Sequence, residues 1–341
     1  MRYNPALDGL RAVAITFVLL AHSFSRVFPS GGIGVDIFFV LSGYLITSIL
    51  TNEINQTGTI SWGGFYWRRF LRLTPALLML AAFQFAHAAV SPHNGPEIRE
   101  STVIALLYLQ NWNMALQLGP ADLIGHTWSL ATEEQFYLLW PLLLPFISKR
   151  RPALIIGLAA IAMTFARFYL WKLGSSYDRI QFAPDVRPIG LLIGCGLAMI
   201  PSARWPRLSA TVPFCLVAFL FALSVLVPDR LCWSFILAPL AASSATAVLI
   251  VALQSGGLFS KALSFAPAVY VGRISYGLYL YSAPIVVLVG VWKHYSGVYQ
   301  LAAIGVSVAA AAASYEFVEK RFLRLKNRYG AKSLRLAAAA E

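Results

Sequence analysis

Long apolar stretches recur along this chain of 341 residues, and short polar links separate them. A stretch of about 18 to 22 apolar residues, coiled as a helix, matches the thickness of the hydrocarbon core of a bilayer. The pattern therefore predicts an all-α polytopic membrane protein, a bundle of about ten transmembrane helices. The expected spans are 10–28, 33–52, 73–91, 127–147, 153–172, 186–200, 210–227, 232–253, 269–291 and 299–317.

The stretch 101–118 begins apolar and is then interrupted by four amide side chains between residues 110 and 117. It is therefore either an eleventh span or a re-entrant or interfacial segment. If it does not cross the membrane and the N-terminus is cytoplasmic, most Lys and Arg residues lie on the cytoplasmic side, as the positive-inside rule requires. If it did cross, the basic clusters at 68–72 and 149–151 would lie on opposite sides. We therefore expect a re-entrant segment near 101–118 and two cytoplasmic termini.

Composition supports a membrane protein, since 58% of the residues are hydrophobic and only 12% are charged. The net charge of +13 could indicate nucleic-acid binding. The basic residues, however, lie in short clusters between apolar stretches, where membrane topology explains them, so no nucleic-acid partner is expected. The three cysteines lack metal-ligand spacing, and no metal is predicted. Residues 1–325 are expected to form one transmembrane domain, and residues 326–341 a basic cytoplasmic tail.

Arg11 and His22 lie within the first apolar region, with ten residues between them. Eleven helical steps are about three turns and roughly 16 Å, so both side chains share one helix face at different depths. Ionisable groups at membrane depth are costly, and they usually mark a functional site. Histidine titrates near neutrality, which suits proton transfer. The alternative is a structural histidine that is hydrogen-bonded to a neighbouring helix.

Asp36 follows a glycine-rich entry to the second span. Its carboxylate could cap the helix, accept a hydrogen bond from a cation, or orient His22. A helix cap is as compatible with the sequence as a catalytic role.

Residues 66–75 have the pattern of an interfacial amphipathic helix that leads into a span. Arg69 and Arg72 are i,i+3 neighbours on one face, and paired guanidinium groups suit the binding of phosphate. Alternatively, these arginines and the adjacent Arg68 are topology cations that meet lipid headgroups.

The densest polar cluster, residues 126–137, opens a span on the predicted outer side. Glu133 and Glu134 would lie within the membrane, so we expect at least one to be protonated or paired with an arginine. Asp185 and Arg187 lie near the outer entrance of another span. They either pair with each other or line a cavity for a hydroxylated ligand.

Together, several ordered segments resemble the acyltransferase-3 family of bacterial membrane acyltransferases, over nearly the whole chain. They are Asp8–Ala12, the Arg11 and His22 spacing, Gly34–Ile46, Tyr66–Pro75, Trp128–Tyr137 and Ser275–Tyr281. The resemblance implies a ten-span bundle that moves acyl groups, usually acetyl, from cytoplasmic acyl-CoA to hydroxyls of surface glycans. It also implies that Arg11 and His22 are essential and that Arg69 and Arg72 serve the donor. One departure is Ser282, where the family often has histidine.

We therefore expect an acyl-CoA-dependent O-acyltransferase of the bacterial inner membrane, with residues 1–325 as its acyltransferase domain and membrane lipids around it. His22 would act as general base toward a hydroxyl of a cell-surface glycan or lipid-linked sugar. Arg11 would hold donor phosphate or stabilise developing charge. The further candidates are Asp36, Glu133 and Glu134 for catalysis, Arg68, Arg69 and Arg72 for acyl-CoA, and His126, Trp128, Ser129, Asp185, Arg187 and Tyr276 for the acceptor.

Two alternatives stay open at this point. The acyl group could pass through a covalent acyl-histidine, and the sequence does not separate this relay from direct transfer. A proton-coupled transporter or flippase could also use intramembrane His, Glu and Arg side chains. Inverted repeats would favour transport, and the sequence reveals none.

Overall fold

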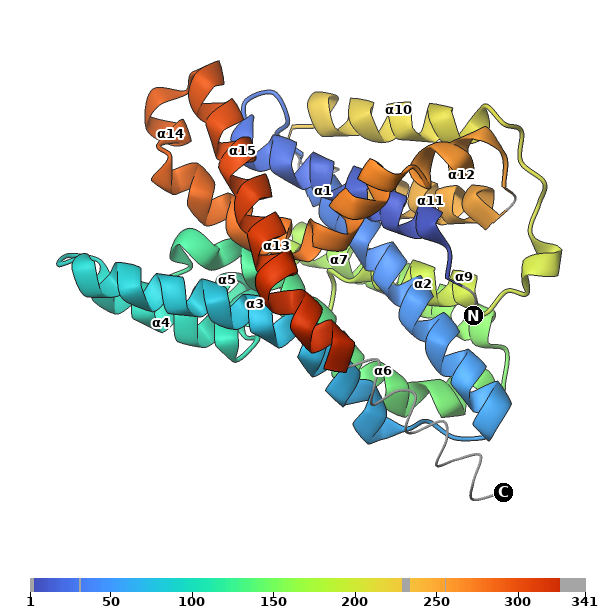
Figure 1. The fold of residues 1–341 in the computed structure, drawn as a ribbon. Helices are drawn as coiled ribbons and strands as arrows, with labels where there is room; N and C mark the ends of the chain where they lie inside the picture. The colour runs from blue at the N-terminus through green and yellow to red at the C-terminus, as the bar shows by residue number, and fades with distance from the viewer. Residues whose placement is uncertain (1–2, 31, 229–233, 255, 326–341) are drawn as a thin grey trace.

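The structure, a computed structural model, describes residues 3–30, 32–228, 234–254 and 256–325 (Figure 1). The described residues form helices joined by turns and loops, with no β-strand among them. The predicted all-α class is confirmed. The proposed basic tail, residues 326–341, lies outside the described residues.

Within the described ranges, seven helices are long and apolar enough to cross a membrane. They are α1 (Pro5–Ser23), α2 (Gly32–Thr57), α3 (Trp62–Val90), α7 (Pro152–Lys172), α11 (Ser234–Gln254), α13 (Ala266–Leu288) and α15 (Gly297–Ser314), which continues through η3 (Tyr315–Glu319). Two apolar helices are shorter, α9 (Ile189–Ala198) and α10 (Val212–Leu226). The glutamate-bearing α6 (Trp128–Ser148) completes a set that overlaps the ten expected spans. How many of them cross the membrane stays a prediction, as does the side on which the termini lie.

The remaining helices are short connectors. They are α4 (Gly95–Leu106), α5 (Gln110–Leu116), η1 (Asp122–Thr127), α8 (Tyr177–Phe182), η2 (Ser202–Arg204), α12 (Gly257–Leu263) and α14 (Val291–His294).

The stretch 101–118 is not one continuous helix. It comprises the end of α4, a break at Tyr108 with a φ of 55°, and α5. The buried amide of Asn111 donates to Thr132 at 3.2 Å and to Gln135 at 2.9 Å, both on α6. Figure 1 shows α4 lying along α3. Two short helices whose polar groups bond to protein agree with the expected re-entrant or interfacial segment.

Helix α1 begins earlier than the expected residue 10. The Asn4 side chain accepts a hydrogen bond from the Ala6 N–H at 3.0 Å, and Pro5 occupies the first helical position. This cap adds a turn that carries Asp8. Residues 66–75 likewise form no separate interfacial helix, because α3 runs continuously through Pro75.

Glycine residues allow α13 to pack closely against α1, and α2 against α9. A Cβ atom at Gly272 of α13 would lie 1.8 Å from the carbonyl oxygen of Asp8, so only glycine permits this approach of α13 to α1. Gly43 of α2 meets the Leu191 carbonyl of α9 in the same way, at 2.1 Å. Helix α1 packs against both α13 and α2, so Asp8 is buried and Arg11 and His22 are only partly exposed.

Candidate functional site

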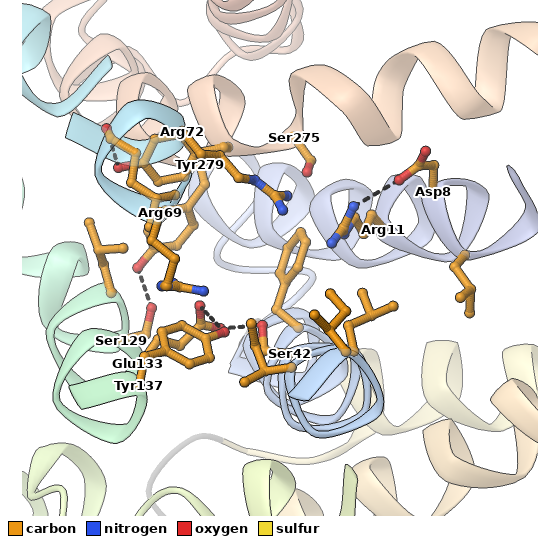
Figure 2. Close-up of a pocket in the computed structure, with 18 of the residues that line it drawn as sticks. Asp8, Arg11, Ser42, Arg69, Arg72, Ser129, Glu133, Tyr137, Ser275 and Tyr279 are labelled. Atoms are coloured by element: carbon orange, nitrogen blue, oxygen red, sulfur yellow. Dashed lines mark hydrogen bonds and ion pairs between the residues drawn. The ribbon is translucent and has the colours of Figure 1, made fainter. Parts of the chain in front are cut away.

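A cavity of about 370 Å³ opens among α1, α2, α3, α6 and α13 (Figure 2). Its lining residues come from the first half of α1, from Val35 to Ile49 of α2, from the first halves of α3 and α6, and from the middle of α13. Asp8 and Arg11 lie toward the N-terminal end of α1, which the predicted topology places on the cytoplasmic side.

Three arginines line the cavity: Arg11 from α1, and Arg69 and Arg72 from α3. Figure 2 shows their guanidinium groups facing the same space. The sequence placed only Arg69 and Arg72 together, from their i,i+3 spacing, and the fold adds Arg11. Three convergent guanidinium groups make this cavity a strong candidate for binding an anion such as phosphate.

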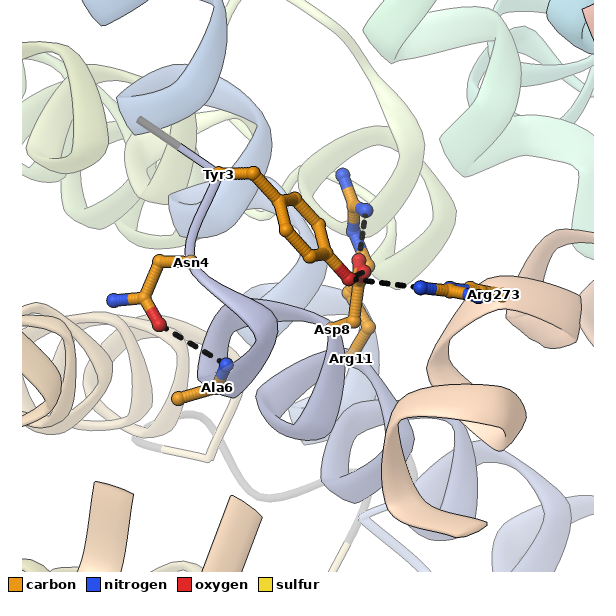
Figure 3. Close-up of polar contacts among 6 residues, drawn as sticks. All are labelled: Tyr3, Asn4, Ala6, Asp8, Arg11 and Arg273. Atoms are coloured by element: carbon orange, nitrogen blue, oxygen red, sulfur yellow. Dashed lines mark hydrogen bonds and ion pairs between the residues drawn. The ribbon is translucent and has the colours of Figure 1, made fainter. Parts of the chain in front are cut away.

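Arg11 is held at the cavity by a network from the N-terminal turn (Figure 3). Its Nη1 donates to Asp8 Oδ1 at 2.8 Å, and the Tyr3 hydroxyl donates to Asp8 Oδ2 at 2.7 Å. Arg273 of α13 donates to the Tyr3 oxygen at 3.3 Å. Sequence reasoning did not select Asp8 as a site residue, although its i,i+3 spacing from Arg11 could have indicated this ion pair.

Arg69 and Glu134 form an ion pair at 2.5 Å, and the Arg69 guanidinium lies 3.3 Å from the centre of the Tyr137 ring. The expectation that at least one of the paired glutamates meets an arginine is therefore confirmed. Glu133 lines the cavity, and it accepts hydrogen bonds from Ser42 Oγ at 3.1 Å and from the Tyr137 hydroxyl at 3.3 Å. Two neighbouring carboxyls thus have different surroundings, one beside a cation and the other beside hydroxyls.

Arg72 differs from the other two arginines. Its side chain is exposed to the cavity, and it makes no hydrogen bond or ion pair with any residue that the structure describes. Arg68, the third predicted donor residue, lies outside the cavity lining, with its Nη2 3.9 Å from Glu53. Of the arginines on α3, Arg72 has the guanidinium most available to a ligand.

His22 lies at the opposite end of α1 from Asp8, and it is not part of the cavity lining. Its Nδ1 is 2.9 Å from Ser282 Oγ of α13, and its ring centre is 5.9 Å from that of His126 in η1. The Nε2 of His126 donates to the Leu280 carbonyl at 3.1 Å. His22, His126 and Ser282 form what we call the histidine cluster, which joins three segments that are distant in sequence.

Tyr279 connects the cavity with the histidine cluster. It lines the cavity, and its hydroxyl lies 2.5 Å from Ser129 Oγ and hydrogen-bonds to the His126 carbonyl. Its ring centre is 5.3 Å from that of His126. Ser129 and Tyr276, two predicted acceptor residues, also line the cavity, and the Tyr276 hydroxyl donates to the Leu73 carbonyl at 3.0 Å.

Asp36 and Arg187 form a separate buried ion pair at 2.5 Å, with side-chain exposures of 2% and 1%. Asp36 therefore accepts from a cation, one of the alternatives considered, and it is Ser282 that lies against His22. Asp185 pairs with Arg179 at 2.5 Å, so Asp185 and Arg187 belong to two different ion pairs. Trp128 is buried beside Arg187, with 5.4 Å between the guanidinium and its ring, and lies outside the cavity lining.

No cluster of three or more His, Cys, Asp or Glu residues in the described part of the chain is arranged to hold a metal ion.

Comparison with known proteins identifies a family whose profile matches most of this chain. The profile of the acyltransferase-3 family, described as an acyltransferase domain, matches residues 4–316. O-acetyltransferase OatA of Staphylococcus aureus is 33% identical over 312 residues, covering 84% of this chain and 51% of the relative. For peptidoglycan O-acetyltransferase OatA of Listeria monocytogenes the identity is 32% over 320 residues, with coverages of 84% and 50%. Putative peptidoglycan O-acetyltransferase YrhL of Bacillus subtilis is 31% identical over 315 residues, with coverages of 84% and 49%.

The chain spans about half the length of these curated relatives. No solved structure matches it significantly.

Proposed function

Because this chain belongs to the acyltransferase-3 family, we propose that it transfers an acetyl group from cytoplasmic acetyl-CoA to a hydroxyl of a cell-wall glycan. The names of the relatives support O-acetyl transfer, and two of them refer to peptidoglycan as the acceptor. The observation that carries the proposal is the convergence of Arg11, Arg69 and Arg72 on one cavity. An acyl-CoA carries several phosphates, and guanidinium groups bind phosphate through paired hydrogen bonds.

The donor would bind with its phosphates at the arginines and its thioester arm directed along α1. Arg11 and His22 are separated by eleven helical steps, roughly 16 Å, and a pantetheine arm is an extended chain suited to such a span. Arg11 lies between the phosphate-binding end and the interior, so it can bind phosphate or stabilise charge on the thioester carbonyl. The cavity end of α1 is thereby the donor side.

The acceptor would approach the histidine cluster from the opposite end of α1. A sugar hydroxyl is a weak nucleophile, and a histidine near it can remove its proton as the new bond forms. His22 is the group that we assign to this role. His126, whose ring centre lies 5.9 Å from that of His22, would contact the same acceptor.

The proposed function is tested with the full chain in lipid nanodiscs, supplied with acetyl-CoA labelled in the acetyl group and with peptidoglycan fragments. We expect label to appear on the glycan as an alkali-labile ester, with release of an equivalent amount of CoA. A transporter or flippase would leave acetyl-CoA intact and move solute across proteoliposomes. That result, without any CoA release, would overturn the proposal.

Replacing Arg72 with alanine is expected to weaken acetyl-CoA binding by about ten- to a hundredfold, because a hydrogen bond to a charged group contributes about 1.5 to 3 kcal/mol. Arg72→Lys should restore part of the affinity, since it keeps the charge and loses the planar fork. Isothermal titration calorimetry with acetyl-CoA measures both effects.

The matched control is Arg68→Ala, which removes an arginine from the same helix outside the cavity lining. Its affinity should stay close to that of the wild type. Equal affinities for the Arg68 and Arg72 alanine variants would leave Arg72 as a topology cation.

A further inference from the structure

The buried Ser282 and the partly buried His22 form a pair at the interface of α1 and α13. Their Nδ1 and Oγ atoms are 2.9 Å apart although 260 positions separate them in the sequence. Ser282 has no exposed surface. A hydroxyl at this distance from an imidazole nitrogen has the geometry of a serine nucleophile and its general base.

The other contacts of Ser282 indicate which atom carries the proton. Within the part of the chain that the structure describes, Ser282 Oγ has no hydrogen-bond partner besides His22. If Nδ1 donated to Oγ, the serine proton would be buried without an acceptor, which is unfavourable. Donation from the Ser282 hydroxyl to Nδ1 satisfies both atoms. In this arrangement Nδ1 is the base and the serine is the group from which it can take a proton.

Ser282 continues the face of α13 that lines the donor cavity. Ser275 and Tyr279 lie in the cavity lining, and Ser282 follows Tyr279 by three positions, which places the three residues along one side of the helix. His22 occupies the equivalent place on α1, three turns beyond Arg11. The pair therefore lies farther along the interface of the two helices that hold the donor.

We propose that Ser282 is the nucleophile that carries the acetyl group as a serine ester between donor and acceptor, with His22 as the base. This inference rests on the proposed function, since it requires a thioester donor and a hydroxyl acceptor. Because Ser282 has no exposed surface, the interface of α1 and α13 has to open locally before each substrate reaches it, and the two substrates bind in turn. The donor departs toward one end of the bundle before the acceptor hydroxyl arrives from the other.

The two half-reactions balance. In the first, His22 Nδ1 takes the Ser282 proton as Oγ bonds to the thioester carbonyl carbon, and the C–S bond breaks. The CoA thiolate then takes the proton from His22. In the second, Nδ1 takes the proton of the acceptor hydroxyl as that oxygen bonds to the acetyl carbon. The bond to Ser282 Oγ breaks, and the serine recovers its proton from His22.

A covalent intermediate predicts isotope exchange without any acceptor. The full chain in nanodiscs is incubated with unlabelled acetyl-CoA and labelled free CoA, and label entering acetyl-CoA is measured. We expect exchange by the wild type and none by Ser282→Ala, whose transfer to glycan should also fall to background. Ser307→Ala is the matched control, because Ser307 is a buried serine of α15 whose one hydrogen bond among the described residues is to Ala303 of its own helix. It should exchange like the wild type.

A second variant keeps the test independent of folding defects. Ser282→Cys retains a nucleophile of similar size, and it should accumulate a hydroxylamine-sensitive acetyl thioester on the peptide that contains position 282, detected by mass spectrometry. Exchange or transfer that persists in Ser282→Ala would overturn the assignment, as would an acetyl group found on His22. Wild-type transfer without exchange would also overturn it while the proposed function stands. Absence of both transfer and exchange in the wild type would overturn the proposed function as well.

Discussion

His22→Ala is expected to lower acetyl transfer to glycan by about a hundred- to ten-thousandfold, the usual contribution of a general base. The variant should fold and insert into the membrane, because His22 is only partly buried and its one described hydrogen bond is to Ser282. Binding of acetyl-CoA should be retained, since the side chain lies outside the cavity lining. Initial rates in nanodiscs and calorimetric titration with acetyl-CoA measure the two quantities separately.

His87→Ala is the matched control for this experiment. His87 lies in the last turn of α3, in another membrane-length helix, and outside both the cavity lining and the histidine cluster. Its variant should transfer acetyl at the wild-type rate. A His22→Ala protein that transfers acetyl at the rate of the His87 control would remove His22 from the mechanism.

The apolar stretches were sufficient to predict the helical bundle, because a bilayer imposes both the length and the composition of a spanning helix. The ends of the helices were less predictable. The start of α1 was placed too late because Asp8 was left outside the expected span, whereas the Asn4 cap extends the helix across it. The added turn places Asp8 in the cavity lining, where it forms an ion pair with Arg11.

Some partners of the charged residues could be predicted from the sequence, and others could not. A pair at i,i+3, such as Asp8 and Arg11, can be predicted from helical spacing alone. The Arg69 pair with Glu134 spans 65 positions, and the Asp36 pair with Arg187 spans 151. Such partners depend on which helices pack together, and hydrophobic periodicity carries no information about that. The contact between Ser282 and His22 could not be predicted for the same reason, although the sequence shows Ser282 as a departure from the histidine that the family often has at this position.

The structure distinguishes carboxylates that pair with an arginine from one that accepts hydrogen bonds from hydroxyl groups, a difference that the sequence does not reveal. Asp36 was selected as a catalytic candidate because its carboxylate could orient His22, and Glu134 because a charge at membrane depth suggests a functional site. In the structure each meets an arginine, while Glu133 faces the cavity beside hydroxyls. A buried carboxylate that is neutralised by an arginine has a sufficient structural explanation. Glu133 is the carboxyl that retains the stronger case for a role toward substrate.

Asp36→Asn is expected to destabilise the folded protein by about 3 to 5 kcal/mol, because it leaves the buried charge of Arg187 without its partner. The side chains of the pair are 2% and 1% exposed, so water cannot compensate for the lost interaction. Reversible unfolding in mixed detergent micelles measures the loss as a change in the free energy of unfolding. The comparison is Asp185→Asn, which breaks the more exposed pair with Arg179 and should cost about 1 kcal/mol or less.

The double variant Asp36→Leu with Arg187→Met distinguishes a structural role from a catalytic one. Replacing both members of a buried ion pair with apolar residues of similar volume is often neutral or stabilising, so this protein should recover most of the lost stability. If Asp36 serves only to neutralise Arg187, the recovered protein should also transfer acetyl near the wild-type rate. A stable double variant without transfer would instead give the Asp36 and Arg187 pair a role in the reaction, for which the sequence had suggested Asp36 as a catalytic residue and Arg187 as an acceptor-binding residue.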